Sequence, residues 1–375
     1  MINCSTFRKI QTVDEFSAAD GQLACSVIQG VDFREAAIEW EEVDLQGTMF
    51  LGCLFPEALR VSRMIANGAL IFPKISGLPY DPYRSSLYSR EELSKGWTSE
   101  DDQSVDKQIY DHFVTTNRHH PPLLESLARS LHDHSIDEAL ADLLNGRTEP
   151  GGIKQVVGVM GGHATSRRDQ FYKEVVLLAW QLTREGYFIA SGGGPGIMEA
   201  ANLGAYLAKQ TLEEVEECLK ILRAAPVYTD PGYVEAAREV LARYPEGSSS
   251  VAVPTWFYGH EPSNLFSIHI AKYFSNSIRE DGLLAVATYG VVYAPGSAGT
   301  TQEIFMDAAQ NHYGSLGSIS PMVFLGEERY TKESQLWPTI QKLAEGQEYG
   351  EMIALTDTAT DSAKFIKAHP PVIKG

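Results

Sequence analysis

Two glycine-rich turns, about a hundred residues apart, constrain this chain more than any other feature. The first is SGGGPGIMEAANLGA at residues 191–205, and the second is APGSAGTTQEIF at residues 294–305. In each, a short apolar run ends at glycines and small residues, and a helical pattern follows directly. This order of strand, tight turn and helix start is typical of α/β proteins with a parallel sheet.

The first turn has the composition of an anion-binding site. Glycine has no Cβ, so the backbone can adopt positive φ and approach a ligand closely. The N–H groups at the start of the following helix point into the same space, with the positive end of the helix dipole behind them. The predicted phosphate-binding positions here are Gly192, Gly193, Gly194, Gly196 and Met198.

The second turn repeats this arrangement and adds reactive groups. Its predicted phosphate-binding positions are Gly296, Ser297, Gly299 and Thr300, and Glu303 follows one turn into the helix. A phosphate-binding turn beside a carboxylate suggests a phosphorylated substrate. Either turn alone is equally compatible with a simple strand-to-helix connection. Glu303 is likewise compatible with a carboxylate that only stabilises the first turn of its own helix.

The surrounding sequence predicts an α/β fold, a doubly wound, mainly parallel Rossmann-like sheet of five or six strands within residues 151–375. A Val-rich strand at 154–160 ends at Gly161 and Gly162, which join the predicted ligand-binding positions. Ligands bind at the carboxyl ends of such strands. Further strands are expected at 187–190, 250–256, 290–294, 321–325 and 352–355, and helices at 169–185, 263–279, 301–312 and 335–344.

Residues 1–150 are predicted to form an accessory region. From Val31 to Phe55 a five-residue rhythm places apolar residues at the centre of each repeat, at Phe33, Ile38, Leu45, Phe50 and Phe55. This stretch resembles a fragment of pentapeptide repeat, and a pair of ordinary strands explains it equally well. Helical periodicity follows at 104–116 and 122–145, where leucines of the second segment form one expected apolar stripe.

Bulk composition excludes several classes of function. The formal charge of 31 − 49 = −18 argues against nucleic acid or an anionic membrane surface as the main partner. The N-terminus lacks a signal-peptide pattern and no apolar run reaches bilayer length, so we expect a cytoplasmic protein. The four cysteines are expected to be buried thiols. We expect solvent-facing histidines and no metal site at positions 112, 119, 120, 132 and 134.

Taken together, the two turns resemble the GGGxGxMEA and PGGxGTxxE segments of the LOG family, the lysine-decarboxylase-like proteins, over roughly residues 154–325. The resemblance implies a cofactor-free, self-associating enzyme that hydrolyses a nucleoside 5′-monophosphate to free base and ribose 5-phosphate. It implies that Gly296, Gly299 and Thr300 hold the phosphate and that Glu303 is the catalytic carboxylate. Ser297 departs from a family glycine, and Gln302 from a frequent glutamate.

A second departure concerns the catalytic cation. The family commonly has MHxRK in the helix before the second turn, where this chain has Ile268-His269-Ile270-Ala271-Lys272, with Ala271 at the arginine position. Lys272 or Arg279 could supply the cation, and the expected helix 263–279 could pair across a two-fold axis in a homo-oligomer. Ala271 favours an alternative function, a non-catalytic protein that binds a nucleotide or molybdenum cofactor in the same crevice.

Overall fold

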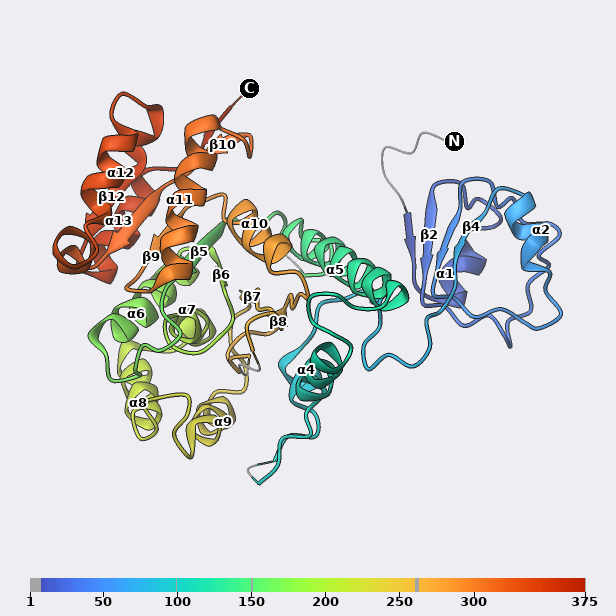
Figure 1. Cartoon of the computed structure of the whole chain (residues 1–375), viewed down its shortest axis with the longest axis horizontal. Coiled ribbons are helices and arrows are strands. Elements are labelled where there is room, and N and C mark those ends of the chain that lie inside the picture. The colour runs from blue at the N-terminus through green and yellow to red at the C-terminus, as the bar shows by residue number, and fades with distance from the viewer. Residues whose placement is uncertain (1–7, 99, 150, 260–262, 375) are drawn as a thin grey trace. The chain divides into compact units, whose positions relative to one another are not determined.

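The computed structural model describes residues 8–98, 100–149, 151–259 and 263–374, which form two compact units. One unit contains residues up to 87 together with 111–140. The other contains 88–110 and 141 onward. Figure 1 labels the helices and strands of both. Among the described residues, no helix combines the length and apolarity that crossing a bilayer requires.

The first unit is built on a four-stranded parallel sheet in the order β1-β2-β3-β4. Successive strands pair in register, with Val27 opposite Met49 and Met49 opposite Leu70. Isolated parallel bridges also join Gln22 to Asp44 and Asp32 to Leu54. The bounds are β1 Arg8–Ile10, α1 Val13–Ala18, β2 Ser26–Gln29, β3 Met49–Leu51, α2 Val61–Ala66 and β4 Leu70–Phe72.

The first unit has a hydrophobic core that contains several aromatic side chains. Three of the five predicted repeat centres, Phe33, Leu45 and Phe50, are fully buried, and Ile38 and Phe55 pack against them partly buried. The stretch contributes strand β3 to a four-stranded parallel sheet, where one of the two expectations was a pair of ordinary strands. The five-residue repeat itself stays a prediction.

Cys53 is a buried free thiol, as is Cys218 in the other unit, but Cys25 is disulfide-bonded, contrary to expectation. Cys4 lies outside the described residues.

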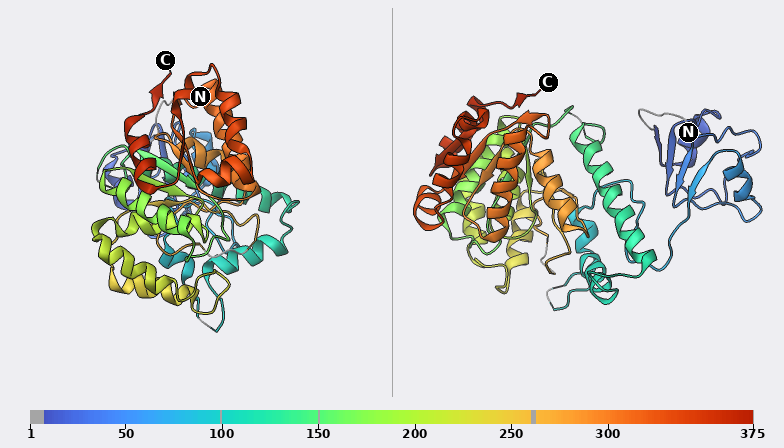
Figure 2. Two further views of the ribbon diagram at one scale, coloured as in Figure 1. Left: turned by 90° about the vertical axis from the view of Figure 1, so that its left-hand side faces the viewer. Right: turned by 45° about the horizontal axis from the view of Figure 1, so that its top comes forward.

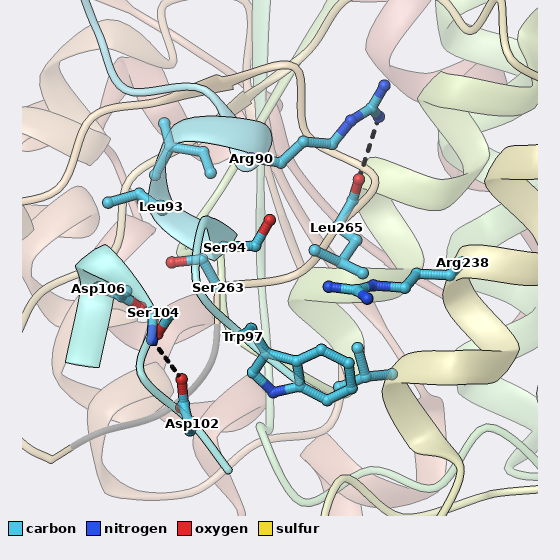
Figure 3. A pocket seen from close by; sticks show the side chains of 12 residues that line it. Arg90, Leu93, Ser94, Trp97, Asp102, Ser104, Asp106, Arg238, Ser263 and Leu265 are labelled. Atoms are coloured by element: carbon cyan, nitrogen blue, oxygen red, sulfur yellow. Dashed lines mark hydrogen bonds between the residues drawn. The ribbon is translucent and has the colours of Figure 1, made fainter. Parts of the chain in front are cut away.

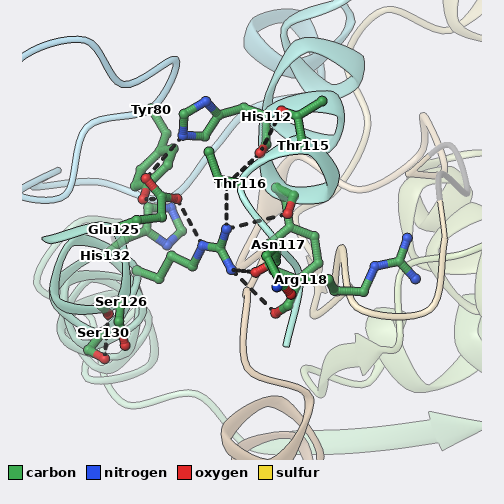
Figure 4. Close-up of polar contacts among 12 residues, drawn as sticks. Tyr80, His112, Thr115, Thr116, Asn117, Arg118, Glu125, Ser126, Ser130 and His132 are labelled. Atoms are coloured by element: carbon green, nitrogen blue, oxygen red, sulfur yellow. Dashed lines mark hydrogen bonds and ion pairs between the residues drawn. The ribbon is translucent and has the colours of Figure 1, made fainter. Parts of the chain in front are cut away.

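The helices α4 (Val105–Thr115) and α5 (Leu123–Leu144) confirm the predicted helical segments. The predicted single leucine stripe is wrong, because Leu123, Leu124 and Leu127 are exposed and only the later part of α5 presents apolar residues to a core. Polar side chains occupy the first part instead (Figure 4). There Glu125 accepts hydrogen bonds from Tyr80 (3.1 Å) and Arg129 (2.8 Å).

This polar cluster also corrects the prediction for two histidines. The Nε2 atom of His112 lies 3.0 Å from Glu125, and fully buried His132 lies 3.0 Å from Asp133 through Nδ1. Burial lowers the pKa of His132. A histidine can be buried when a neighbouring carboxylate satisfies its ring nitrogen. The histidines at 119, 120 and 134 are exposed, as predicted.

The second unit confirms the doubly wound α/β fold. Its sheet has seven strands, all parallel, in the order β12-β11-β9-β5-β6-β7-β8. The bounds are β5 Val156–Met160, β6 Phe188–Ser191, β7 Val251–Ala252, β8 His269–Ile270, β9 Val291–Tyr293, β11 Met322–Leu325 and β12 Ile353–Thr356. A separate antiparallel pair joins β10 (Ser318–Ile319) to β13 (Val372–Ile373).

Helices cover this sheet as binary patterning predicts. The helix α6 begins at Asp169, whose side chain accepts a hydrogen bond from the N–H of Phe171 (2.7 Å), and it buries one apolar face on the sheet. Figure 1 shows α8 beside α9, and α11 to α13 gather in both views of Figure 2. The helices of this unit are α3 Arg90–Ser94, α6 Gln170–Arg184, α7 Ile197–Tyr206, η1 Leu207–Lys209, α8 Leu212–Leu222, α9 Tyr233–Arg243, α10 Asn276–Val286, α11 Ala298–Tyr313, η2 Arg329–Glu333, α12 Leu336–Ala344, η3 Glu348–Met352 and α13 Ala359–Ala368.

The predicted helix at 263–279 is wrong. Its middle forms strand β8, which pairs with β7 and makes the sheet one strand wider than expected. The N–H of Ala271 donates to the carbonyl of Ala252 (2.8 Å), and Ile270 exchanges hydrogen bonds with Tyr88. These tertiary backbone pairings outweigh the local helical periodicity. The proposed pairing of this segment as a helix across a two-fold axis therefore has no basis.

Candidate functional site

The candidate site lies at the carboxyl edge of the seven-stranded sheet, where the chain order reverses. The strand β5 is central, β6 lies on one side and β9 on the other. Such a reversal leaves a crevice between loops that diverge to opposite faces. The loop after β5 begins at Gly161, the loop after β6 is the first glycine-rich turn, and the loop after β9 is the second.

The three loops meet at Gly162. Its N–H donates to the carbonyl of Pro295 (3.0 Å), and its own carbonyl accepts from the N–H of Ile197 (3.1 Å). A Cβ on Gly196, which has φ +68°, would lie 2.4 Å from this carbonyl, and one on Gly296 would lie 3.1 Å from the Gly162 nitrogen. Glycine is therefore required in both predicted turns for packing of backbone against backbone.

Much of the first turn is occupied by the protein itself. Gly193 and Gly194 are buried, and their carbonyls accept hydrogen bonds from Asn264 (2.9 and 3.4 Å). A Cβ on Gly192 would press on the sulfur of Met198, and one on Gly161 would press on Ile197. These four contacts explain the local sequence by packing within the protein, so the glycines of the first turn do not by themselves indicate a ligand.

The second turn is open. Ser297 and Gly299 are exposed, and a Cβ on Gly299 would meet no heavy atom within 4 Å. The first intrahelical hydrogen bond of the turn runs from Thr301 to the carbonyl of Ser297 (3.0 Å), so the N–H groups at 298–300 precede it. Thr300 is buried beneath Gly296. An anion at this helix start would meet free N–H groups and the positive end of the dipole.

An open pocket of about 310 Å³ lies between these loops. One side comes from the loop after β5, another from the second turn, and a third from η2. Arg329 closes the third side, where its guanidinium donates to the carbonyl of Gly296 (2.6 Å) and pairs with Glu333 (3.1 Å). The lining residues are Gly162, His163, Ala164, Thr165, Pro295, Gly296, Ser297, Arg329 and Glu333.

Glu303 and Arg279 are brought together one helical turn from the second turn. The Nη1 atom of Arg279 lies 3.7 Å from Oε1 of Glu303, and both side chains are about 12% exposed. Burial raises the pKa of Glu303 to about 7, although Arg279 lowers it, and neighbouring Glu280 raises it further. The Nε atom of Arg279 is buried and, among the described residues, has no hydrogen-bond partner. Such an unsatisfied buried donor is uncommon in a folded protein.

Glu280 organises the same cluster and was not predicted from the sequence. Its carboxylate accepts hydrogen bonds from Tyr258 (3.2 Å) and from Gln302 (2.7 Å), and lies 3.9 Å from Arg279. Gln302 occupies the position of the frequent family glutamate and here acts as a donor to Glu280. Glu280 lies in the second turn of α10, and nothing in the local sequence distinguishes it from an ordinary helix carboxylate except that the fold buries it.

Lys272 is held elsewhere. Its ammonium group donates to Asp106 (2.8 Å) and to Ser263 (3.2 Å), and it is almost fully buried. Asp106 and Ser263 line a second pocket, shown in Figure 3, in which Arg238 stacks 4.2 Å over Trp97. Of the two predicted cations, the structure therefore brings Arg279 to Glu303 and commits Lys272 to Asp106.

Within the described ranges, no group of three or more His, Cys, Asp or Glu side chains is arranged to hold a metal.

A second buried carboxylate lies behind the site, one turn further along α11. Asp307 accepts hydrogen bonds from Tyr293 (2.8 Å) and Asn311 (3.1 Å), and burial raises its pKa to about 7. Its folded-state pKa lies above the unfolded value of 3.8, so the folded state binds the extra proton. This group therefore stabilises the fold at low pH and loses that contribution as pH rises from about 4 to about 7.

We expect Asp307→Asn to remove this pH dependence. The wild type should lose about 4 kcal/mol of unfolding free energy through this group between about pH 4 and about pH 8, because burial raises its pKa from 3.8 to about 7 and each pKa unit corresponds to about 1.4 kcal/mol. Urea unfolding of both proteins at several pH values measures the difference, with Glu328→Gln at an exposed ion pair as the control. Parallel stability curves for wild type and Asp307→Asn would contradict the prediction.

The sequence matches no protein-family model and no curated protein. Two solved structures are similar in fold over 57% of this chain. The molybdenum cofactor binding protein from the phototrophic bacterium Rippkaea orientalis is 14% identical, is covered over 96% of its length and has a TM-score of 0.37. The Moco carrier protein from Chlamydomonas reinhardtii is 15% identical, is covered over 98% of its length and has a TM-score of 0.36. At these values the similarity says nothing about what this chain binds.

Proposed function

We propose that the α/β unit hydrolyses the N-glycosidic bond of a nucleoside 5′-monophosphate, releasing free base and ribose 5-phosphate. The observation that carries this proposal is the pairing of Glu303 with Arg279 one turn beyond an open helix start. In this proposal the anion binds at the helix start, and the sugar attached to it lies beside Glu303. The motif resemblance to the LOG family points to the same reaction.

The chemistry requires a carboxylate beside the sugar. Cleavage of a glycosidic bond builds positive charge on the ribose ring, as in other oxocarbenium-like transition states. An ionised Glu303 stabilises that charge and accepts a proton from the attacking water. A carboxyl group with a pKa of about 7 can both accept and return a proton at neutral pH.

Arg279 has two tasks in this proposal. Its positive charge keeps a share of Glu303 ionised despite burial. Its buried Nε–H lacks a partner within the described part of the chain, and in this proposal a substrate oxygen accepts that hydrogen bond. A guanidinium presents donors in a planar fork, so it can hold Glu303 and a substrate oxygen together.

If the helix start binds the phosphate group, the protein should distinguish a nucleoside monophosphate from the corresponding nucleoside. Purified protein is incubated with AMP, GMP, CMP and UMP and, in parallel, with the matching nucleosides, and free base is followed by chromatography. We expect base release from at least one monophosphate and at least 100-fold less from its nucleoside, because the nucleoside lacks the group that the helix start binds. Equal release from both, or none from any monophosphate, would contradict the proposal.

The ion pair between Lys272 and Asp106 favours a second candidate, a protein that binds the same ligand without cleaving it. The pair engages Lys272, one of the two alternative residues expected to supply the cation beside Glu303. Such a protein would retain an intact nucleotide, or a nucleotide-like cofactor such as molybdenum cofactor, in the same crevice. Stoichiometric binding of intact AMP with no free base over hours would support this candidate. A homo-oligomer and the 1–150 and 151–375 domain boundary remain predictions.

A further inference from the structure

Tyr258 is an exposed aromatic side chain that is fixed at its polar end. Its ring is 61% exposed, although its hydroxyl accepts a hydrogen bond from Asn276 (2.9 Å) and donates to Glu280 (3.2 Å). Exposed tyrosines without such bonds sample several rotamers. Here Asn276 and Glu280 hold the hydroxyl, so the ring is ordered before any ligand arrives.

The backbone before Tyr258 is fixed as well. The hydroxyl of Thr255 accepts a hydrogen bond from the N–H of Phe257 (3.0 Å) and donates to the carbonyl of Tyr273 (3.0 Å). The Phe257 ring meets the Tyr258 ring edge to face, with centroids 5.3 Å apart. The loop after β7 therefore presents Tyr258 in one orientation.

Hydrogen bonds connect this ring to the Glu303 and Arg279 pair. Glu280, which accepts the Tyr258 proton, also accepts a hydrogen bond from Gln302 and lies 3.9 Å from Arg279. Gln302 is the neighbour of Glu303 on α11. The loop after β7 and the starts of α10 and α11 follow the carboxyl ends of parallel strands, at the edge of the sheet where the crevice is, and Glu280 and Gln302 lie in the second turns of these two helices.

We propose that Tyr258 is the stacking surface for the nucleobase of the substrate. This inference rests on the proposed function. A planar ring that is already ordered binds another planar ring without paying further rotamer entropy. Stacking on an aromatic face tolerates every base, so Tyr258 would accept both purines and pyrimidines, with larger purines held more tightly.

If Tyr258 stacks on the base, its removal should weaken binding of AMP and leave binding of ribose 5-phosphate, which has no base, unchanged. Affinities for AMP and for ribose 5-phosphate are measured by calorimetry in a Glu303→Gln background, which keeps the nucleotide intact. The substitutions Tyr258→Ala and Tyr258→Phe are each introduced into the Glu303→Gln protein. We expect Tyr258→Ala to weaken AMP at least tenfold, corresponding to about 1.4 kcal/mol, and to change the ribose 5-phosphate affinity less than twofold. Tyr258→Phe should lose less AMP affinity than Tyr258→Ala, because the ring remains while the hydrogen bonds that order it are lost.

The matched control is Tyr313→Ala, which removes an 80% exposed tyrosine at the far end of α11 and should affect neither ligand. An equal loss of both ligands in Tyr258→Ala, or no loss of AMP, would overturn the stacking role while leaving the proposed hydrolase intact. Failure of both ligands to bind the Glu303→Gln protein and the wild type would overturn the proposed site and this inference with it. The KM for AMP gives a second readout, and we expect it to be at least tenfold higher in Tyr258→Ala than in the wild-type enzyme.

Discussion

Replacing Glu303 with glutamine is expected to lower base release by about 100- to 10,000-fold, the range for a positioned general base or charge stabiliser. Glutamine matches the shape of glutamate but has neither its negative charge nor its proton affinity. The loss should appear in kcat and in kcat/KM alike, because the interaction forms in the transition state. Glu328→Gln, which changes a 74% exposed side chain, is the matched control and should retain wild-type rates.

The pH dependence gives an independent check on the same residue. Glu303 must be ionised to act as base, and its pKa is raised to about 7. We therefore expect kcat/KM for AMP to rise with pH through about 7 and then level off. Arg279→Met removes the cation that lowers this pKa, so the midpoint should move upward. Wild-type rates in Glu303→Gln, or a flat profile between about pH 5 and about pH 9, would contradict the assignment.

Replacing Glu199 with alanine is expected to destabilise the α/β unit by about 3–5 kcal/mol, the cost of leaving a buried charge without its partner. Glu199 belongs to the first glycine-rich motif, where it is 1% exposed. Arg167 donates to both of its oxygens at 2.9 and 2.6 Å, and the hydroxyls of Tyr172 and Tyr233 donate at 2.8 and 2.9 Å. One carboxylate thus connects the loop after β5 to α6, α7 and α9.

Thermal unfolding followed by circular dichroism measures this loss, which should lower Tm by roughly 6–20 °C. The control is Glu217→Gln, which breaks a half-exposed ion pair with Lys220 and should cost less than about 1 kcal/mol. The double variant Arg167→Met, Glu199→Gln should recover part of the stability, since it leaves no uncompensated charge. A Tm for Glu199→Ala within 2 °C, or about the scatter of such scans, of the wild-type value would disprove the structural role.

The central strands of the fold could be predicted because their sequences are locally unambiguous. The segments at 156–160, 188–191, 291–293 and 322–325 are short, apolar and followed by turn residues, and all four form parallel strands. The strand β8 could not be predicted in this way. It is two residues long and pairs at the sheet edge with β7 and Tyr88, residues that lie far away in the chain.

The site could be predicted only where its residues belong to one local pattern. The second turn and Glu303 lie within ten residues of each other, and the helix periodicity relates them directly. The partner of Lys272 lies 166 residues away at Asp106, and the contacts of Glu280 reach back to Tyr258. Such long-range pairings depend on how the strands are ordered, which no local pattern in the sequence encodes.

The contact of three loops at Gly162 limits how this crevice can change during evolution. A larger residue there would press on the carbonyl of Pro295 in the second turn and on the hydroxyl of Thr165 in its own loop, so these two loops cannot vary independently. A substitution at Gly162 would therefore need a compensating change in the second turn for this crevice to keep its shape.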